Sequence, residues 1–369
     1  MDLQVLQENL SKALSTCLRF TSSKVQLPVL ANILLRTNKN KLLLSATNLE
    51  TSVSVQVGAK VIKEGSLTIP ARVITELVNN LGPGQVNLSS DKENLKIKTQ
   101  NFESVISGMS SSEFPNVPSE TGAQSFRISS KNLLDALSIT LFAVSVDETR
   151  PVLTGVLILI DKETLTLVAT DGFRLSQKKI TIDKSKEEIK LILPKGVLSE
   201  LARLSDNEFI NFSYKHSDNQ VVLGLSDSVL SSRVIEGEFP DFERIIPKET
   251  KIKVKVDKDE LLRSIKLAGV FARDSANVVK LTTSENSLEV LAESSLSGSQ
   301  KTSIDAKIEN GVSGAFTIAF NYRFVEDFLN TAKGESISLE FSDPNSPALF
   351  LDDKDTNYLH IIMPVKLQS

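Results

Sequence analysis

The segment VATDGFRLS (168–176) carries the side chains best placed to do chemistry, because Asp171 and Arg174 directly follow an apolar stretch. A carboxylate at the end of a strand can act as a general base. No second acid, base or nucleophile stands beside Asp171, and Asp-Gly at a strand end is a common turn signal. We therefore predict that Asp171 shapes a turn and that the chain has no catalytic residue.

Motifs of the main catalytic and cofactor-binding classes do not occur in the sequence. HExxH, CxxC and GxSxG are absent, so zinc proteases, zinc ribbons and α/β-hydrolases lack their residues. The phosphate-binding patterns GxxxxGKS/T and GxGxxG are absent as well. The two histidines, His216 and His360, lie in separate segments. The sequence predicts a protein that is not an enzyme and that has no cofactor and no metal site.

The composition indicates a soluble globular protein of a reducing compartment. The apolar share is 40% and the charged share 24%, and the only cysteine, Cys17, rules out an intramolecular disulfide. The first residues, MDLQVLQENLSKALS, lack the apolar run of a secretory signal, and no stretch reaches the ~18 apolar residues of a membrane span. We expect a cytoplasmic protein with no membrane partner. The net charge of −4 does not indicate nucleic-acid binding, but it leaves room for a basic patch.

Four landmarks recur three times along the chain. LLLSATNLETSV (42–53), LTLVATDGFRLSQ (165–177) and LEVLAESSLSGSQ (288–300) each read as a strand and a corner, and their alanines stand at 46, 169 and 292, 123 residues apart each time. The other landmarks are two amphipathic helices and a proline near the end of each repeat. The first helices begin near residues 7, 130 and 257, the second helices near 71, 194 and 321, and the prolines are Pro115, Pro240 and Pro364.

The shared period predicts three tandem copies of one α+β domain. Each copy has two helices and otherwise short strands with period-2 patterns, which are typical of antiparallel sheets. We expect domains over 1–122, 126–248 and 252–369. Pro70 and Pro194 are expected at the first position of the second helices, and Asn321 replaces the proline in the third copy.

Four segments together resemble the bacterial sliding clamps, the beta-subunit family of DNA polymerase III. They are LPVLANILL (27–35), VATDGFRLS (168–176), GEFPDFERIIP (237–247) and YLHIIMPVKL (358–367), and the resemblance extends from Met1 to Leu367. The patterns ATDGxRL, FPDxxRxxP and MPVKL occur in the family's order and spacing.

The resemblance implies a head-to-tail dimer that closes into a ring of six domains around duplex DNA, with helices on the inside and sheets outside. Such a ring binds DNA without sequence preference and does not itself form or break a covalent bond. It tethers the DNA polymerase III alpha subunit, the clamp loader and other replication or repair proteins, and so raises their effective concentration on DNA.

A partner pocket between the second and third domains takes short peptides in this family. Carried over residue by residue, the pocket comprises Leu153, Thr170, Gly172, Phe173, Arg174, Leu175, Pro240, Arg244, Ile245, Phe324, Ile361, Met363, Pro364, Val365, Lys366 and Leu367. Three positions depart from the family: Phe173 replaces histidine or tyrosine, Phe324 replaces tyrosine, and Lys366 replaces arginine. Gln368 and Ser369 extend past the usual end. These departures affect peptide preference rather than the existence of the pocket.

DNA contacts are expected from basic residues on the inner face of the ring. The positions that match the family are Lys24 and Arg150, although Pro151-Val152 replaces a tyrosine pair found in some members. The further candidates lie on the predicted helices and are Arg72, Lys195, Arg203, Arg263 and Lys266. Acidic residues share those helices, so ordinary solvated faces are the alternative interpretation.

Two other classes of function remain as alternatives. One is a β-rich scaffold or carbohydrate-binding module with tandem domains, which has no reason to carry ATDGFRL, FPDFERIIP and MPVKL together. The other is a hydrolase that works through Asp171 or His216, in which case Asp171→Ala abolishes an activity.

Overall fold

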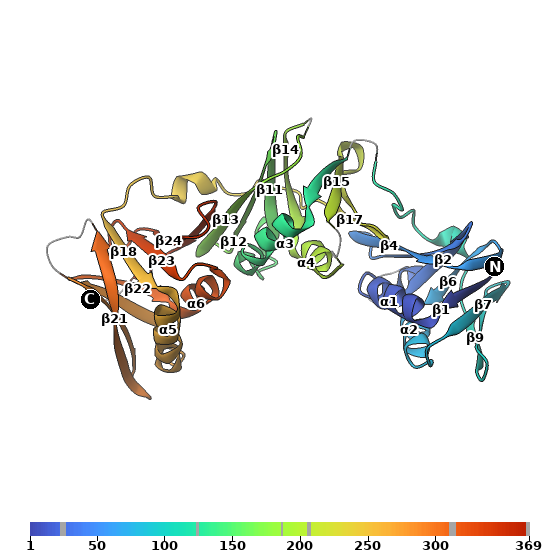
Figure 1. Ribbon diagram of the computed structural model, residues 1–369, viewed down its shortest axis with the longest axis horizontal. Coiled ribbons are helices and arrows are strands. Elements are labelled where there is room, and N and C mark those ends of the chain that lie inside the picture. Colours follow the sequence, from blue (N-terminus) through green and yellow to red (C-terminus); the bar gives the residue numbers. More distant parts are fainter. Residues whose placement is uncertain (23–26, 123–124, 186, 205–207, 310–314, 367–369) are drawn as a thin grey trace. The chain divides into compact units, whose positions relative to one another are not determined.

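The computed structural model describes residues 1–22, 27–122, 125–185, 187–204, 208–309 and 315–366. These residues form two compact units (Figure 1). The first unit comprises 1–130 and 203–234, and the second comprises 131–202 and 235–369. The second repeat contributes to both units, so the domain boundaries expected from the repeats stay a prediction. Within the described ranges, no helix is long and apolar enough to cross a membrane.

Each repeat supplies two helices, as the periodicity predicts. They are α1 (Gln7–Leu18) and α2 (Ala71–Asn79), α3 (Ser130–Ser138) and α4 (Lys195–Leu204), and α5 (Lys258–Ala272) and α6 (Tyr322–Thr331). Asp257 caps α5, since its side chain accepts from the Glu260 N–H, and Asn321 caps α6 by accepting from the Arg323 N–H. The expected position of Pro70 and Pro194 is wrong by one residue. Both are the last residues of strands, because their extended backbone still belongs to the sheet.

The first unit holds a five-stranded and an eight-stranded sheet, ordered β5-β1-β7-β8-β9 and β10-β15-β16-β17-β4-β3-β2-β6. The strands are β1 (Asp2–Leu6), β2 (Asn32–Asn38), β3 (Lys41–Thr47), β4 (Thr51–Gly58), β5 (Lys60–Lys63), β6 (Ser66–Pro70), β7 (Gln85–Asp91), β8 (Asn94–Lys98), β9 (Glu103–Ser107), β10 (Phe126–Ser129), β15 (Phe209–Lys215), β16 (Gln220–Gly224) and β17 (Ser228–Arg233). Strand β17 of the second repeat pairs with β4 of the first, and the buried hydroxyls of Ser52 and Ser231 hydrogen-bond across this junction at 2.6 Å. Helices α1 and α2 pack together beside these strands (Figure 1).

The second unit is built on one sheet of twelve strands, ordered β14-β11-β12-β13-β25-β24-β23-β18-β21-β20-β19-β22. The strands are β11 (Gly155–Asp161), β12 (Thr164–Thr170), β13 (Arg174–Thr181), β14 (Ile189–Pro194), β18 (Ile252–Asp257), β19 (Val278–Ser284), β20 (Ser287–Ser294), β21 (Gly298–Glu309), β22 (Phe316–Asn321), β23 (Ser336–Phe341), β24 (Ala348–Asp352) and β25 (Tyr358–Ile362). Helices α5 and α6 cover a core that includes Phe320, Phe328, Phe341 and Phe350, all fully buried. Strand β13 of the second repeat pairs with β25 of the third, which brings the two predicted halves of the peptide site into one sheet.

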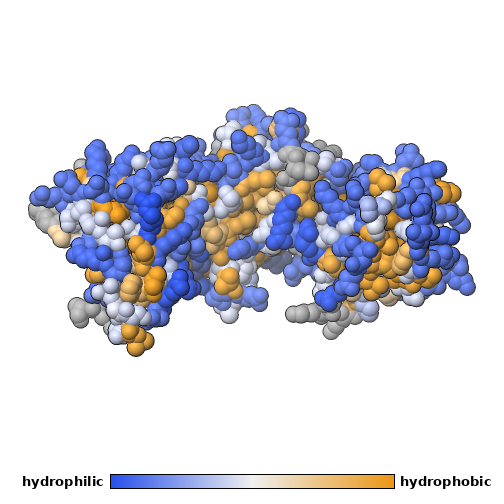
Figure 2. Space-filling view, turned by 60° about the horizontal axis from the view of Figure 1, so that its bottom comes forward, coloured by the Kyte–Doolittle hydropathy of each residue, from blue (hydrophilic) through white to orange (hydrophobic). Residues whose placement is uncertain are grey.

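All strand pairings named above are antiparallel, and the α+β class expected from the sequence is confirmed. Most side chains on the face shown in Figure 2 are hydrophilic, and the hydrophobic ones gather in separate patches.

Candidate functional site

The turn between β12 and β13 is organised by Asp171. Its Oδ1 accepts hydrogen bonds from the backbone N–H groups of Phe173, at 2.9 Å, and Arg174, at 3.0 Å. The Thr170 hydroxyl donates to the Arg174 carbonyl at 2.6 Å and accepts from the Gly172 N–H at 3.0 Å. Gly172 has φ +93°, a conformation that favours glycine. Asp171 therefore shapes the turn, as the sequence predicts.

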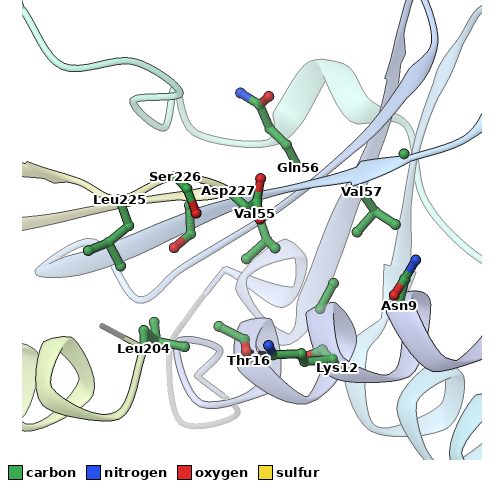
Figure 3. Close-up of a pocket in the computed structure, with 13 residues that line it drawn as sticks. Asn9, Lys12, Thr16, Val55, Gln56, Val57, Leu204, Leu225, Ser226 and Asp227 are labelled. Atoms are coloured by element: carbon green, nitrogen blue, oxygen red, sulfur yellow. Dashed lines mark hydrogen bonds between the residues drawn. The ribbon is translucent and has the colours of Figure 1, made fainter. Parts of the chain in front are cut away.

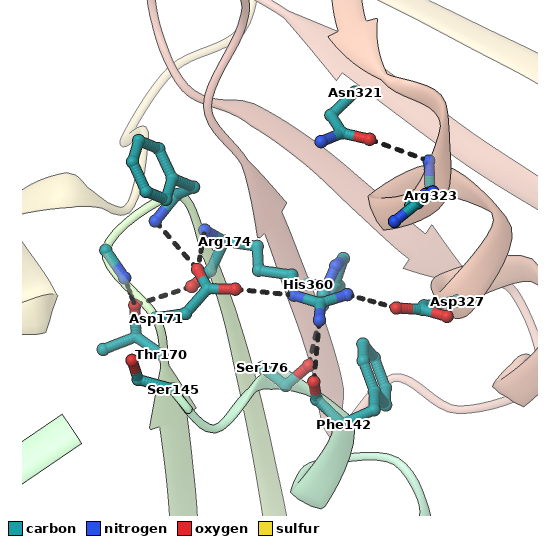
Figure 4. Close-up of polar contacts among 12 residues, drawn as sticks. Phe142, Ser145, Thr170, Asp171, Arg174, Ser176, Asn321, Arg323, Asp327 and His360 are labelled. Atoms are coloured by element: carbon teal, nitrogen blue, oxygen red, sulfur yellow. Dashed lines mark hydrogen bonds and ion pairs between the residues drawn. The ribbon is translucent and has the colours of Figure 1, made fainter. Parts of the chain in front are cut away.

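Arg174 occupies the centre of a polar network that joins the second and third repeats (Figure 4). Its Nε lies 3.0 Å from Asp171 Oδ2, its Nη1 lies 2.5 Å from Asp327 Oδ2, and its Nη2 donates to the Phe142 carbonyl at 2.8 Å. The guanidinium carbon lies 4.5 Å from the ring centroid of Phe324 and 5.2 Å from that of Phe142. The Arg174 side chain is only 11% exposed. Its charge is therefore used in contacts within the protein rather than presented to solvent.

His360, which the sequence left without a role, lies fully buried beside this network. Its Nδ1 is 2.7 Å from the Ser176 hydroxyl, and its ring stacks on Phe328 with centroids 5.4 Å apart. Burial, aided by the positive charge of Arg174, lowers the pKa of His360 to about 3, so the ring is neutral at physiological pH. Nε2 has no hydrogen-bond partner among the described residues. The hydrolase alternative gains no support at Asp171, because its oxygens accept hydrogen bonds from the turn and pair with Arg174. His216 lies on the short helix His216–Asp218, in the first unit, whereas Asp171 belongs to the second.

Several predicted pocket residues form one apolar cluster. Leu153, Leu175 and Ile361 are buried and pack in a cluster with Phe239 and other side chains. Leu153 belongs to the short helix Pro151–Leu153 that precedes β11, and Leu175 pairs with Ile361 across β13 and β25. These residues come from three distant segments, and only the tertiary structure brings them together.

The exposed part of the predicted pocket adjoins this cluster along the chain, since Phe173 stands two residues before Leu175 and Met363 two residues after Ile361. The Phe173 side chain is 60% exposed and that of Ile245 is 38% exposed, whereas Met363, Pro364 and Val365 are partly buried. The Met363 N–H donates to the Phe173 carbonyl at 2.8 Å. The C-terminal segment is thus held against the turn of the second repeat.

The other predicted pocket residues vary in their accessibility. Pro240, Arg244 and Lys366 are exposed, and Arg244 pairs with Asp241 at 2.7 Å. Thr170 is buried. Leu367, Gln368 and Ser369 lie outside the described residues.

Sequence reasoning missed Asp327, Phe142, Ser176 and His360, since no sequence motif assigns them a contact.

The predicted DNA-binding residues are placed mostly on helices. Arg72 lies on α2, Lys195 and Arg203 on α4, and Arg263 and Lys266 on α5; Arg72, Arg203, Arg263 and Lys266 are exposed. Lys24 lies outside the described residues. Arg150 differs from the others, because it pairs with Asp147 at 3.2 Å and its Nη2 is 3.4 Å from the Asp171 carbonyl. It therefore borders the Asp171 turn.

A cavity that the sequence did not predict lies in the first unit (Figure 3). It has a volume of 270 Å³ and is lined by residues of α1 and β4 and by the turn at 225–228. Its polar lining includes Lys12 and Asp227, and its apolar lining includes Val55 and Leu225.

Within the described ranges, no group of three or more His, Cys, Asp or Glu side chains is arranged to hold a metal ion.

Three family models match this chain in succession. The N-terminal domain of the DNA polymerase III beta subunit matches residues 1–118, the central domain matches 127–241, and the C-terminal domain matches 243–366. The beta sliding clamp of Staphylococcus aureus is 28% identical over 377 residues, and the alignment covers 99% of each chain. That of Staphylococcus epidermidis is 27% identical over 376 residues, again with 99% of each chain covered.

Solved structures agree with these matches. The DNA polymerase III beta subunit of Thermotoga maritima superposes with a TM-score of 0.90 at 28% identity and covers 100% of both chains. The DNA polymerase sliding clamp of Bacillus subtilis superposes with a TM-score of 0.94 at 25% identity, also over 100% of both chains. The resemblance read from the sequence is confirmed: this chain belongs to the DNA polymerase III beta subunit family, the bacterial DNA sliding clamps.

Proposed function

We propose that two copies of this chain close head to tail into a ring of six domains that encircles duplex DNA and tethers replication proteins to it. The family consists of processivity factors without catalytic activity, so the chain is not an enzyme. Each copy supplies three similar domains, so two copies supply six near-equal units. These units can form a closed, symmetric ring without further subunits. We further propose that the ring acts in the cytoplasm.

We propose that partner proteins bind through short peptides at the surface formed by Phe173, Ile245, Phe324 and the segment 363–366. The observation that carries this proposal is the hydrogen bond of the Met363 N–H to the Phe173 carbonyl, next to the strand pair that joins the buried Leu175 and Ile361. Exposed aromatic side chains beside apolar surface are common anchors of bound peptides. The alpha subunit of DNA polymerase III and the clamp loader are the expected owners of such peptides.

Duplex DNA is proposed to contact the basic side chains of the helices. Arg72, Arg203, Arg263 and Lys266 are exposed, and contacts to phosphate need no base readout. Lys195 is half-buried at the start of α4. The position of Arg150 beside the Asp171 turn makes it the weakest of these candidates.

The proposed ring is tested by measuring how long the loaded protein is retained on DNA. After loading by a clamp loader, the protein should stay on a nicked circular plasmid and leave when the plasmid is linearised. Equal retention on both forms would contradict topological binding. Sedimentation provides an independent check, because the ring requires a dimer of twice the 40.4 kDa chain.

A further inference from the structure

The cavity of the first unit lies where the first and second repeats meet (Figure 3). Helix α1 and strand β4 of the first repeat line it, together with the turn 225–228 of the second repeat. The Gln56 N–H of β4 donates to the Asp227 carbonyl at 2.8 Å, which holds this turn against the first repeat. The volume of 270 Å³ equals that of roughly nine water molecules, so the cavity has room for a small organic molecule.

A second cavity occupies the equivalent position between the second and third repeats. It has a volume of 240 Å³ and lies within the second unit. The backbone contact recurs there, since the Lys179 N–H donates to the Asn357 carbonyl at 3.0 Å. The lining recurs at the repeat spacing of 123 residues, so that Asn9, Lys12 and Val55 of the first cavity correspond to Asn132, Asp135 and Lys178 of the second. The two cavities can therefore be compared position by position.

Charged side chains of the second cavity are paired within the protein. Lys178 Nζ lies 2.5 and 2.6 Å from the two carboxylate oxygens of Asp355. Lys333 Nζ lies 3.0 Å from Asp135 Oδ2. Each ion pair joins the second repeat to the third, so these four charges are used within the fold.

Apolar side chains replace one of these ion pairs in the first cavity. Val55 takes the place of Lys178. Leu225, two residues before Asp227, takes the place of Asp355. Both Val55 and Leu225 are partly exposed, so the first cavity offers an apolar surface where the second offers paired charges.

Two charges of the first cavity have no partner in the described part of the chain. Lys12 takes the place of Asp135, and Asp227 takes the place of Asn357. Neither Lys12 nor Asp227 forms an ion pair with another described residue, and both are exposed. Figure 3 shows Lys12 on α1 and Asp227 on the other side of the cavity. Opposite charges on facing walls, with apolar side chains beside them, fit a ligand that has both charges and an apolar body.

We propose that this cavity binds a small zwitterion with an apolar body, whose anionic group pairs with Lys12 and whose cationic group pairs with Asp227. Val55 and Leu225 contact the apolar body. The inference is independent of the proposed peptide site, because the residues that line the cavity belong to the first unit and those of the peptide site belong to the second.

The test uses three probes with the same carbon chain, namely 6-aminohexanoate, hexanoate and hexylamine. Each is titrated at pH 7 into the full-length protein, labelled at the methyl groups of Ile, Leu and Val and observed by NMR. We expect 6-aminohexanoate to shift the Val55 and Leu225 signals and to bind about three-fold more tightly at low salt than either singly charged probe. The signal of Ile180, which lines the second cavity, should not move.

Variants separate the two charges. Lys12→Gln should remove the advantage of 6-aminohexanoate over hexylamine, and Asp227→Asn should remove its advantage over hexanoate. The double variant Val55→Lys/Leu225→Asp recreates the ion pair of the second cavity and should abolish the binding of all three probes, with the melting temperature as the check on folding. Lys301→Gln, which removes an exposed lysine that pairs with Glu289, is the control and should change nothing.

Equal affinity for the three probes, or unmoved Val55 and Leu225 signals with all of them, would overturn the inference. Weaker binding of a short DNA duplex to Lys12→Gln, with unchanged probe binding, would assign Lys12 to phosphate and also overturn it. Phe173→Ala should leave probe binding unchanged, so failure of the proposed peptide site is detected separately.

Discussion

Arg174 of the second repeat and Asp327 of the third form an ion pair, with Nη1 2.5 Å from Oδ2, although 153 residues separate them in the sequence. The arginine also binds the largely buried Asp171 carboxylate and the Phe142 carbonyl, so its loss would remove three polar contacts at once. We expect Arg174→Gln to lower the free energy of unfolding by about 3 kcal/mol. Urea denaturation followed by circular dichroism measures this.

Asp327→Asn is the companion variant. Its carboxylate is 43% exposed, so we expect a loss below about 1 kcal/mol. Lys96→Gln, which breaks the exposed pair with Glu103, should have no measurable effect. Equal losses for Arg174→Gln and Lys96→Gln would contradict the central role of Arg174.

Protonation of His360 should make stability depend on pH. Burial and the Arg174 charge lower its pKa in the folded state to about 3, whereas the unfolded chain binds a proton near the ordinary value of about 6.5. The folded state therefore keeps its full stability above about pH 6.5 and loses it as the pH falls toward 3. The loss from this one group is about 2 kcal/mol at pH 5.

Thermal unfolding between pH 7.5 and pH 5 measures this effect. His360→Gln should show a smaller fall in stability over that interval than the parent protein. His216→Gln tests the only other histidine and should keep the parent's pH dependence. The same fall in His360→Gln would locate the titrating group elsewhere.

Gly269 is expected to tolerate no side chain. An alanine Cβ at this position would lie 2.7 Å from the Tyr322 ring, so Gly269→Ala should destabilise the protein by about 1–3 kcal/mol despite the higher helix propensity of alanine. Gly196, on α4, is the matched control because a Cβ added there would meet nothing within 4 Å. Gly196→Ala should leave the melting temperature unchanged or raise it, and equal effects at both glycines would refute the packing argument.

Phe173 should contribute to peptide binding without contributing to stability. Its side chain is 60% exposed, so Phe173→Ala should leave the melting temperature nearly unchanged. Its loss should weaken the binding of an apolar partner peptide by about 2 kcal/mol or more, the usual cost of truncating a hot-spot aromatic. Leu296→Ala removes another exposed apolar side chain, 86% exposed, in the β20–β21 turn and serves as the control. Isothermal titration calorimetry compares the two variants, and unchanged affinity in Phe173→Ala would argue against the site.

The salt dependence of DNA binding tests whether the basic side chains of the helices contact phosphate. Arg263 and Lys266 are three residues apart on α5 and both are exposed. If both contact phosphate, the double variant Arg263→Gln/Lys266→Gln should reduce the slope of log K against log salt by about 1.8, since each contact contributes about 0.9. Anisotropy with a short duplex at several salt concentrations gives the slope. An unchanged slope would place both residues away from DNA, and Lys301→Gln serves as the charge control.

Local information in the sequence was enough for the repeats, the helices and the turn at Asp171. Helix positions follow from the spacing of apolar residues such as Leu133 and Leu137, and the Asp171 turn follows from hydrogen bonds within four residues. The resemblance to the clamp family likewise rests on contiguous motifs. Such features depend on neighbours along the chain, so a single sequence displays them.

The tertiary structure alone decided which of those residues act together. Leu153, Leu175 and Ile361 share one cluster because β13 pairs with β25 across 184 residues, as the Ser176–His360 contact shows. Arg174, which the sequence predicts as a peptide contact, is largely buried in the structure and contacts Asp171 and Asp327 instead. The Tyr322 ring of α6 packs on Gly269 of α5, 53 residues away in the sequence, and only the tertiary structure shows this contact. Packing between distant segments has no periodicity in the sequence, and this is the physical reason why those relationships could not be predicted from it.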